Sequence, residues 1–237
     1  MNAAQQGRVL GVIQARMGSS RLPGKALIDL AGKPLVWHMI DRMRRVNGVS
    51  EIVLATTADP RNEPLIDFCK SEGIDSFRHD VEDDLAGRIS GAIEGRPGDV
   101  ILKTGGDCPL IDPEVLQRMV DTALADPAAD FVSNRVQWSY PLGLSADVVS
   151  RRSIEWADAN LTSDEDRELF AVWIRDHPDR FKVIPIVHEG EDLSHLNWCV
   201  DTAEDLAAVR EIFDALYIPG QCFGFRDALA FLAKKVG

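Results

Sequence analysis

Short apolar runs alternate with helix-periodic segments through the first half of the chain, and this alternation restricts the fold more than any other feature. The runs fall at residues 8–14, 51–56, 99–104 and 130–133, with a weaker one at 75–78. Because these runs lack a polar face, they are typical of strands buried on both sides, as in a parallel sheet. Parallel neighbours need crossover connections, which are usually helices. The sequence therefore predicts an α/β fold with a doubly wound, mostly parallel sheet.

Helix-periodic segments and a less regular second half complete the expected order of elements. Apolar residues recur at the helical spacing of three and four in segments 33–46, 62–72, 84–94 and 114–125. After residue 134 we expect an excursion from the sheet at 135–149, helices at 151–161 and 164–177, a strand at 181–187, and helices at 201–216 and 223–236. We therefore expect a single domain over residues 1–237, with an inserted lobe at residues 135–187.

The charge balance and the cysteine distribution argue against several classes of protein. The 237 residues carry a formal net charge of −12, and such an acidic surface repels the phosphate backbone of a nucleic acid. The apolar runs are too short to cross a bilayer, so we expect no membrane partner. Four scattered cysteines are typical of free thiols in a reducing compartment. We expect a cytoplasmic enzyme.

Residues 14–25, QARMGSSRLPGK, directly follow the first apolar run and form the most informative segment. They place three cations, Arg16, Arg21 and Lys25, among glycines and serines. Backbone N–H groups and hydroxyls in such a turn donate to phosphate oxygens, and three cations balance a triphosphate. The segment is not a Walker A motif, because Ala26 follows Lys25 where that motif has Ser or Thr. The alternative is a polar loop whose cations are only solvated.

Two aspartates follow apolar runs farther along the chain. Asp107 lies in the segment KTGGDCPLID, and Asp201 follows the short apolar run 198–200. Carboxylates at the carboxyl edge of a parallel sheet can hold Mg²⁺ against the phosphates of a ligand. The alternative for Asp107 is a turn cap. The alternative for Asp201 is a helix N-cap with Glu204 as its capping-box partner.

Three further features admit both a functional and a structural interpretation. His195 is the histidine that we favour for a role in the site, although single histidines are mostly structural. Arg88 follows three acidic residues, which is also the pattern of a helix-surface ion pair. Residues 138–143, which include Trp138 and Tyr140, are a substrate lip, a packed loop or a subunit contact.

Three segments in this order, QARMGSSRLPGK, KTGGDCPLID and HLNWCVDTAEDL, resemble the cytidylyltransferases of surface-polysaccharide synthesis. The nearest branch is the family of spore coat polysaccharide biosynthesis protein F, which is related to the acylneuraminate and Kdo cytidylyltransferases. The resemblance extends from about Val9 to Tyr217 and implies a nucleotide-diphospho-sugar transferase-like fold. It also implies a homodimer built partly from residues 135–187.

The resemblance assigns roles to particular positions. Arg16, Arg21 and Lys25 match triphosphate-binding residues, and Asp107 and Asp201 match two carboxylates that bind Mg²⁺; we count all five as catalytic. The other positions on the nucleotide side are Gln14, Ala15, Gly18, Ser19, Arg88 and Gly106. We place on the acceptor side Tyr140, Pro141, Gly143 and His195.

Several positions depart from the family pattern. Lys103 stands where an Arg is expected, and Leu169 stands where His is frequent. Ser145 and Asp147 replace the more usual Asp and Glu. Gly105 replaces a Thr or Gln, and because it has no side chain to read cytosine, we expect looser discrimination between bases.

These observations predict an enzyme that transfers CMP from CTP to a sugar acid or similar acceptor and releases pyrophosphate. Mg²⁺ is the expected cofactor, and no residue stands out as a general base. One alternative is a nucleotidyltransferase that uses another NTP, or a phosphonate or phospho-alcohol acceptor. The other is a non-catalytic regulator that binds a nucleotide.

Overall fold

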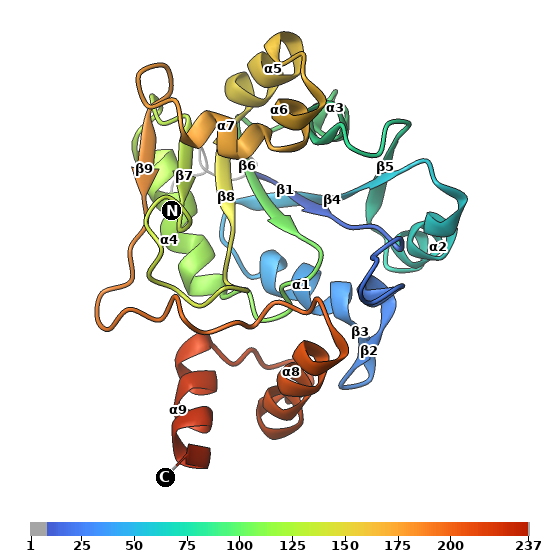
Figure 1. Ribbon diagram of the computed structural model, residues 1–237, viewed down its shortest axis with the longest axis vertical. Coiled ribbons are helices and arrows are strands. Elements are labelled where there is room, and N and C mark those ends of the chain that lie inside the picture. Colours follow the sequence, from blue (N-terminus) through green and yellow to red (C-terminus); the bar gives the residue numbers. More distant parts are fainter. Residues whose placement is uncertain (1–8, 237) are drawn as a thin grey trace.

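A seven-stranded sheet in the order β5-β4-β1-β6-β8-β7-β9 forms the centre of the computed structural model, which describes residues 9–236 (Figure 1). The strands are β1 (Val9–Gln14), β4 (Val49–Thr57), β5 (Asp75–His79), β6 (Val100–Gly105), β7 (Phe131–Ser133), β8 (Asp147–Ser150) and β9 (Val183–Pro185). Only β8 runs antiparallel to its neighbours; every other pair in this sheet is parallel. The predicted mostly parallel α/β sheet is confirmed. Arg8, the expected first residue of the first strand, lies outside the described residues.

Helices cover both faces of this sheet (Figure 1). On one face lie α3 (Leu85–Ile93), α5 (Arg151–Asn160), α6 (Asp164–Glu168) and α7 (Phe170–Arg175), and on the other α1 (Leu35–Arg44), α2 (Glu63–Ser71), α4 (Pro113–Ala125), α8 (Ala203–Leu216) and α9 (Phe225–Val236). Successive side chains of a strand point to opposite faces. Val12 therefore joins the core that includes Ile89 of α3, and Ile13 joins the core that includes Met39 of α1. None of the helices in the described part of the chain is long and apolar enough to cross a membrane.

Local signals determine where two of the helices begin. Lys33–Pro34 forms strand β3 of a small hairpin with β2 (Asp29–Leu30), so α1 begins at Leu35, later than the predicted start of the helix. Asp112 caps α4, with proline at the first helical position, and its carboxylate accepts a hydrogen bond from the N–H of Glu114 at 2.8 Å.

Two expectations for the second half of the chain are wrong. Residues 147–149 do not leave the sheet, because they belong to β8, which pairs with both β6 and β7. Since β8 joins the sheet in reverse direction, no helical crossover marks it in the sequence. The predicted helix 164–177 is broken at Leu169: α6 buries no side chain, whereas α7 turns Phe170 and Ile174 into the core. The inserted lobe stays a prediction, although β8 and β9 within it belong to the central sheet.

The register of the sheet brings two loops together at its carboxyl edge. Gln14, the last residue of β1, pairs with Gly105, the last residue of β6. The basic loop that follows β1 therefore begins beside the loop that carries Asp107. Ligands of such sheets bind outside the carboxyl ends of the strands, so this edge is where a site is expected.

Candidate active site

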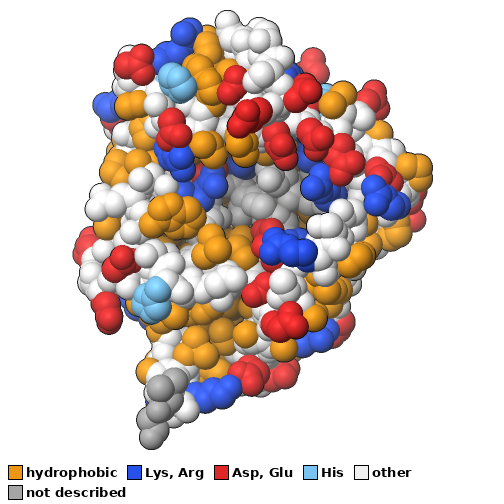
Figure 2. Space-filling model, in the orientation of Figure 1, with side chains coloured by type: hydrophobic (Ala, Val, Ile, Leu, Met, Phe, Trp, Pro, Cys, Tyr) orange, Lys and Arg blue, Asp and Glu red, His pale blue; other side chains and the backbone are white. Residues whose placement is uncertain are grey.

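A cavity of about 330 Å³ opens at this edge. Its walls come from the loop after β1, the region at the start of α3, the loop after β6, the end of α6 and the segment before α8. Figure 2 shows this face with a hollow flanked by Lys and Arg side chains. The predicted nucleotide and metal residues that line the cavity are Gln14, Ala15, Arg16, Ser19, Arg21, Lys25, Arg88, Gly106, Asp107 and Asp201.

The cavity is also lined by Gly105, the position expected beside the base, and by four residues that the sequence analysis did not assign to the site: Ser20, Glu82, Leu85 and Glu168. Glu82 pairs with Arg16 at 2.6 Å, and its place in the acidic run before Arg88 is the only signal that could have found it. Glu168 reaches the cavity because α6 packs against α3, which no local pattern shows. Of the predicted nucleotide residues, Gly18 does not line the cavity; it lies beside the guanidinium of Arg61.

The basic loop is held in shape by its own backbone and by one anchor. Gly24 has a φ of +75°, which glycine adopts without steric cost, and its N–H donates to the carbonyl of Met17 at 2.9 Å. The N–H of Met17 in turn donates to Oδ1 of Asn62 at 2.7 Å. The chain therefore folds back on itself, and Lys25 returns to the cavity at the start of a 3₁₀ turn, Lys25–Leu27.

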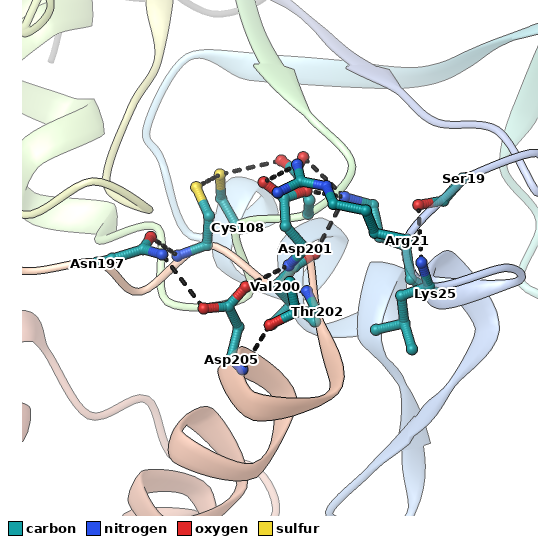
Figure 3. Close-up of polar contacts among 12 residues, drawn as sticks. Ser19, Arg21, Lys25, Cys108, Asn197, Val200, Asp201, Thr202 and Asp205 are labelled. Atoms are coloured by element: carbon teal, nitrogen blue, oxygen red, sulfur yellow. Dashed lines mark hydrogen bonds and ion pairs between the residues drawn. The ribbon is translucent and has the colours of Figure 1, made fainter.

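Lys25 lies between the two predicted metal ligands. Its Nζ is 2.7 Å from Oδ1 of Asp201 and 3.1 Å from Oδ2 of Asp107, and it also donates to the carbonyl of Val200 at 3.0 Å. Figure 3 shows Lys25 and Arg21 approaching Asp201 from the basic loop. Burial by itself lowers the pKa of Lys25, but the two carboxylates outweigh it and raise the pKa above its ordinary value. Lys25 is therefore a charged group bridging two segments that are far apart in sequence.

Asp201 is not the cap of α8, so that interpretation is wrong. Thr202 is the N-cap, and its hydroxyl accepts a hydrogen bond from the N–H of Asp205 at 3.1 Å. Asp205, not Glu204, completes the capping box by accepting from the N–H of Thr202 at 2.9 Å. Because its neighbour caps the helix, the carboxylate of Asp201 is free to face the cavity. There it also pairs with Arg21 at 2.9 Å.

Asp107 faces the same point from the loop after β6. Apart from Lys25, its carboxylate accepts a hydrogen bond from the thiol of Cys108, with 3.2 Å between Sγ and Oδ1. The backbone N–H of Val200 donates to the carbonyl of Asp107 at 2.8 Å, which fixes this loop against the segment that carries Asp201. The two carboxylates are thus held together by a backbone contact as well as by Lys25.

Two aspartate carboxylates that face a common cation fit Mg²⁺, which takes one or two protein carboxylates and completes its shell with water and phosphate oxygens. Cys108 and Cys199 lie next to Asp107, with their sulfur atoms 3.3 Å apart. Thiols are not the hard oxygen ligands that Mg²⁺ prefers. The hydrogen bond with Cys199, burial and Asp107 all raise the pKa of Cys108, so the Cys108 thiol stays protonated.

Arg88 is buried, so the interpretation as a surface ion pair is wrong. Its side chain lies on the sheet side of α3, is 6% exposed, and donates to the backbone carbonyl of Glu82. Its Nε has no hydrogen-bond partner, and neither has Oε1 of Gln14, another lining residue. Burial lowers the pKa of Arg88, and Arg16 lowers it further. This side of the cavity therefore holds buried polar atoms without partners in the protein.

Two glycines of the loop after β6 are required by space. A Cβ at Gly106 would lie 2.6 Å from Cβ of Ala15 and 2.8 Å from the carbonyl of Gln14, so a side chain there would push the two loops apart. A Cβ at Gly105 would lie 2.9 Å from Oδ1 of Asp107. A larger residue at 105 therefore requires a different placement of the Asp107 carboxylate.

The residues predicted for the acceptor side do not line this cavity. Tyr140 is buried, and its ring packs edge-on against Phe225, with 5.8 Å between centroids. Leu142 of the same segment pairs with residues 196–198, and Gly143, at a φ of +108°, lies too close to the backbone of Trp198 to carry a side chain. His195 is exposed. Roles for these positions in acceptor binding stay predictions. What the structure shows is that Leu142 holds the segment that leads to Asp201.

This chain is similar to known cytidylyltransferases. The family model described as cytidylyltransferase matches residues 10–217. The spore coat polysaccharide biosynthesis protein SpsF of Bacillus subtilis is 29% identical over 211 residues, 86% of this chain and 86% of that protein. A 3-deoxy-manno-octulosonate cytidylyltransferase of Trichlorobacter lovleyi is 36% identical over 121 residues, 51% of this chain and 46% of that protein.

The similarity to a solved cytidylyltransferase structure covers the whole fold. The cytidylyltransferase from Leptospira borgpetersenii has a TM-score of 0.89 to this chain at 26% identity, and the match covers 96% of this chain and 94% of that one. The family model spans all three segments that carry the resemblance, from the basic loop after β1 to the segment before α8. The chain belongs to the cytidylyltransferase family.

Proposed function

We propose that this protein transfers CMP from CTP to a sugar acid or a similar anionic acceptor, with release of pyrophosphate. The observation that carries the proposal is the convergence of Lys25, Asp107 and Asp201 at one end of a cavity lined by Arg16 and Arg21. Such a cavity provides cations for a triphosphate and paired carboxylates for its metal ion. The family membership supplies the choice of a cytidine nucleotide.

The chemistry is an in-line displacement at the α-phosphate. A hydroxyl oxygen of the acceptor forms a bond to the α-phosphorus and gives up its proton to solvent. The bond from that phosphorus to the bridging oxygen breaks, and its electron pair leaves with pyrophosphate. Arg16, Arg21 and Lys25 bind the phosphates and stabilise the charge that builds on the leaving pyrophosphate. Asp107 and Asp201 would hold Mg²⁺, which when bound neutralises phosphate charge. Such catalysis consists mostly of positioning and electrostatics, so it does not require a dedicated general base.

An anionic sugar acceptor is supported by two relatives. SpsF is named for spore coat polysaccharide biosynthesis, and the relative from Trichlorobacter lovleyi is named for a sugar acid, 3-deoxy-manno-octulosonate. The second match covers only about half of each chain, so it carries less weight than the first.

Pyrophosphate release is the test of this function. Purified protein with Mg²⁺ and each of CTP, UTP, ATP and GTP is assayed against a panel of 2-keto sugar acids, phosphonates and phospho-alcohols. We expect turnover with CTP and a sugar acid. Turnover with another NTP or with a phospho-alcohol would instead identify the alternative nucleotidyltransferase, and saturable CTP binding without turnover would identify a regulator.

The same assay measures base discrimination. Because Gly105 has no side chain, we expect CTP to be preferred over UTP by less than about 10⁴-fold, the range that dedicated hydrogen-bonding sites reach. A larger preference would show that other groups read the base fully.

A further inference from the structure

All hydrogen-bonding capacity of Lys25 is used by acceptors within the protein. An ammonium has three N–H donors, and the three acceptors around Nζ are Asp107 Oδ2, Asp201 Oδ1 and the carbonyl of Val200. The side chain is 13% exposed. The proposed function asks Lys25 to bind phosphate and asks the same two carboxylates to bind a divalent cation. In the structure, Lys25 instead forms ion pairs with these two carboxylates.

We propose that Lys25 acts as a resident cation, which keeps divalent ions out of the nucleotide-free site until the phosphates of the nucleotide draw it away. The inference rests on the proposed function and adds an order of events to it. The nucleotide binds before its metal ion or together with it, and the free protein has only weak affinity for the metal.

Geometry makes the two cations exclusive. A Mg²⁺ ion binds carboxylate oxygens at about 2.0–2.1 Å, whereas Nζ already lies 2.7 and 3.1 Å from one oxygen of each aspartate. A divalent ion on those oxygens would lie next to a positive ammonium with little solvent between them, and like charges at such a distance repel strongly. Occupation by one cation therefore requires the departure of the other.

Lys25 has both a reason and a means to leave when a nucleotide arrives. The triphosphate offers oxygens of higher charge than the carboxylates, and the flexible four-carbon stem of a lysine lets the ammonium swing while the backbone stays in place. Arg21 does not take over its position, because it contacts the other oxygen of Asp201, Oδ2, and its side chain is 63% exposed. The nucleotide thus frees the carboxylates by attracting the ammonium.

Metal binding to the nucleotide-free protein tests this inference. Mn²⁺ serves as the probe, and its free concentration is followed by electron paramagnetic resonance for wild type, Lys25→Gln and Lys25→Met. Lys33→Gln is the matched control, because Lys33 is an exposed lysine that contacts Trp37. We expect both Lys25 variants to bind Mn²⁺ more tightly than wild type, on the order of tenfold, the size of typical coupling between ligands. The control should match wild type.

A double variant assigns the gain to this site. Adding Asp201→Asn to Lys25→Gln should remove the extra Mn²⁺ affinity, because it removes a carboxylate that Lys25 shields. Circular dichroism of each variant checks that the fold is retained, and the two replacements at position 25 guard against failure of either one.

The inference is overturned if wild type and the Lys25 variants bind Mn²⁺ equally, whether tightly or not at all, or if the gain survives Asp201→Asn. Failure of the proposed function has a different signature. In that case wild type with Mg²⁺ and CTP releases no pyrophosphate with any acceptor, whatever the Mn²⁺ affinities of the nucleotide-free proteins.

Discussion

Two clusters of charged side chains lie along strand β6, one just after its carboxyl end and one within it, and they have different roles. At the carboxyl end, Lys25 lies between Asp107 and Asp201, whose side chains are 30% and 32% exposed. Within the strand, Lys103 pairs across to Asp147 of β8 at 3.5 Å, and Arg135 contacts the same carboxylate at 2.5 Å. In the first cluster one ammonium is shared by two carboxylates, and Arg21 also contacts Asp201; in the second, two cations share one carboxylate.

Burial separates the roles of the two clusters. Asp147 is 2% exposed, and Ser133 donates a further hydrogen bond to it at 2.7 Å, so its oxygens are occupied by neighbours on β6 and β7. A ligand has no access to it, and the cluster holds the antiparallel strand in the sheet. The carboxylates around Lys25 border an open cavity, where a ligand can replace their partner. Similar residue types therefore stabilise the sheet around Asp147 and form a binding site around Lys25.

The largest effect is expected from Asp147→Asn. The substitution leaves Lys103, which is 6% exposed, buried without a carboxylate, and breaking such a pair costs about 3–5 kcal/mol. Urea unfolding should show this loss. Asp67→Asn, which removes an exposed pair with Lys70, should cost almost nothing. An unfolding free energy for Asp147→Asn within error of wild type would contradict a locking role.

The next effect is expected from Asp107→Asn and Asp201→Asn, which remove charge from the cavity. Turnover should fall by roughly 10²–10³-fold, the loss typical of one group that stabilises transition-state charge, while the free energy of unfolding changes little. Glu204→Gln is the matched control, because it neutralises an exposed carboxylate of α8 that does not line the cavity. Near-normal turnover in Asp201→Asn would remove that residue from the metal site.

A smaller effect is expected from Arg21→Ala. The side chain of Arg21 is 63% exposed, so its pair with Asp201 resembles a surface ion pair, worth at most about 1 kcal/mol. A phosphate contact at so exposed a side chain is screened by solvent in the same way, so we expect kcat/KM for CTP to fall by only roughly fivefold. Arg61→Ala is the control, because Arg61 is equally exposed and pairs with Asp59 outside the cavity. Equal effects of the two substitutions would argue against phosphate binding by Arg21.

The smallest effect concerns acid stability. Burial by itself raises the pKa of Asp147, but Arg135 and Lys103 outweigh it, so the pKa in the folded protein lies below the ordinary 3.8. The stability that this lowered pKa provides is present above about pH 4 and is lost as the pH falls through the folded pKa. Asp147→Asn should therefore flatten the acid limb of stability against pH below 3.8.

Asp201→Asn should change the loss of stability at low pH less than Asp147→Asn does. The pKa of Asp201 is also lowered, because Lys25 and Arg21 outweigh the opposing effect of burial, but its side chain is partly exposed. Solvent screens such pairs, so the flattening should be weaker than in Asp147→Asn. Acid titrations monitored by circular dichroism measure both, and a stronger flattening in Asp201→Asn would reverse the assignment of the two clusters.

Local sequence pattern determined the parallel half of the sheet and most of the cavity's residues. The apolar runs of β1 and β6 specify buried strands, and the polar residues that follow each run must then lie at one edge. For this reason Arg16, Lys25 and Asp107 could be assigned to the site from the sequence. The cap of α4 at Asp112 is equally local, since capping depends on neighbours in the chain.

Only the tertiary structure decided the features that depend on partners far along the chain. β8 is four residues long and gains its place by pairing with β6, about which its own sequence says nothing. The cap of α8 falls at Thr202, one residue from the predicted position, and this single step turns Asp201 from a helix cap into a cavity residue. Lys25 meets Asp107 and Asp201 across 82 and 176 residues. Periodicity and capping act over a few residues, whereas charge contacts and strand pairing are set by which distant segments the fold brings within a few ångströms of each other.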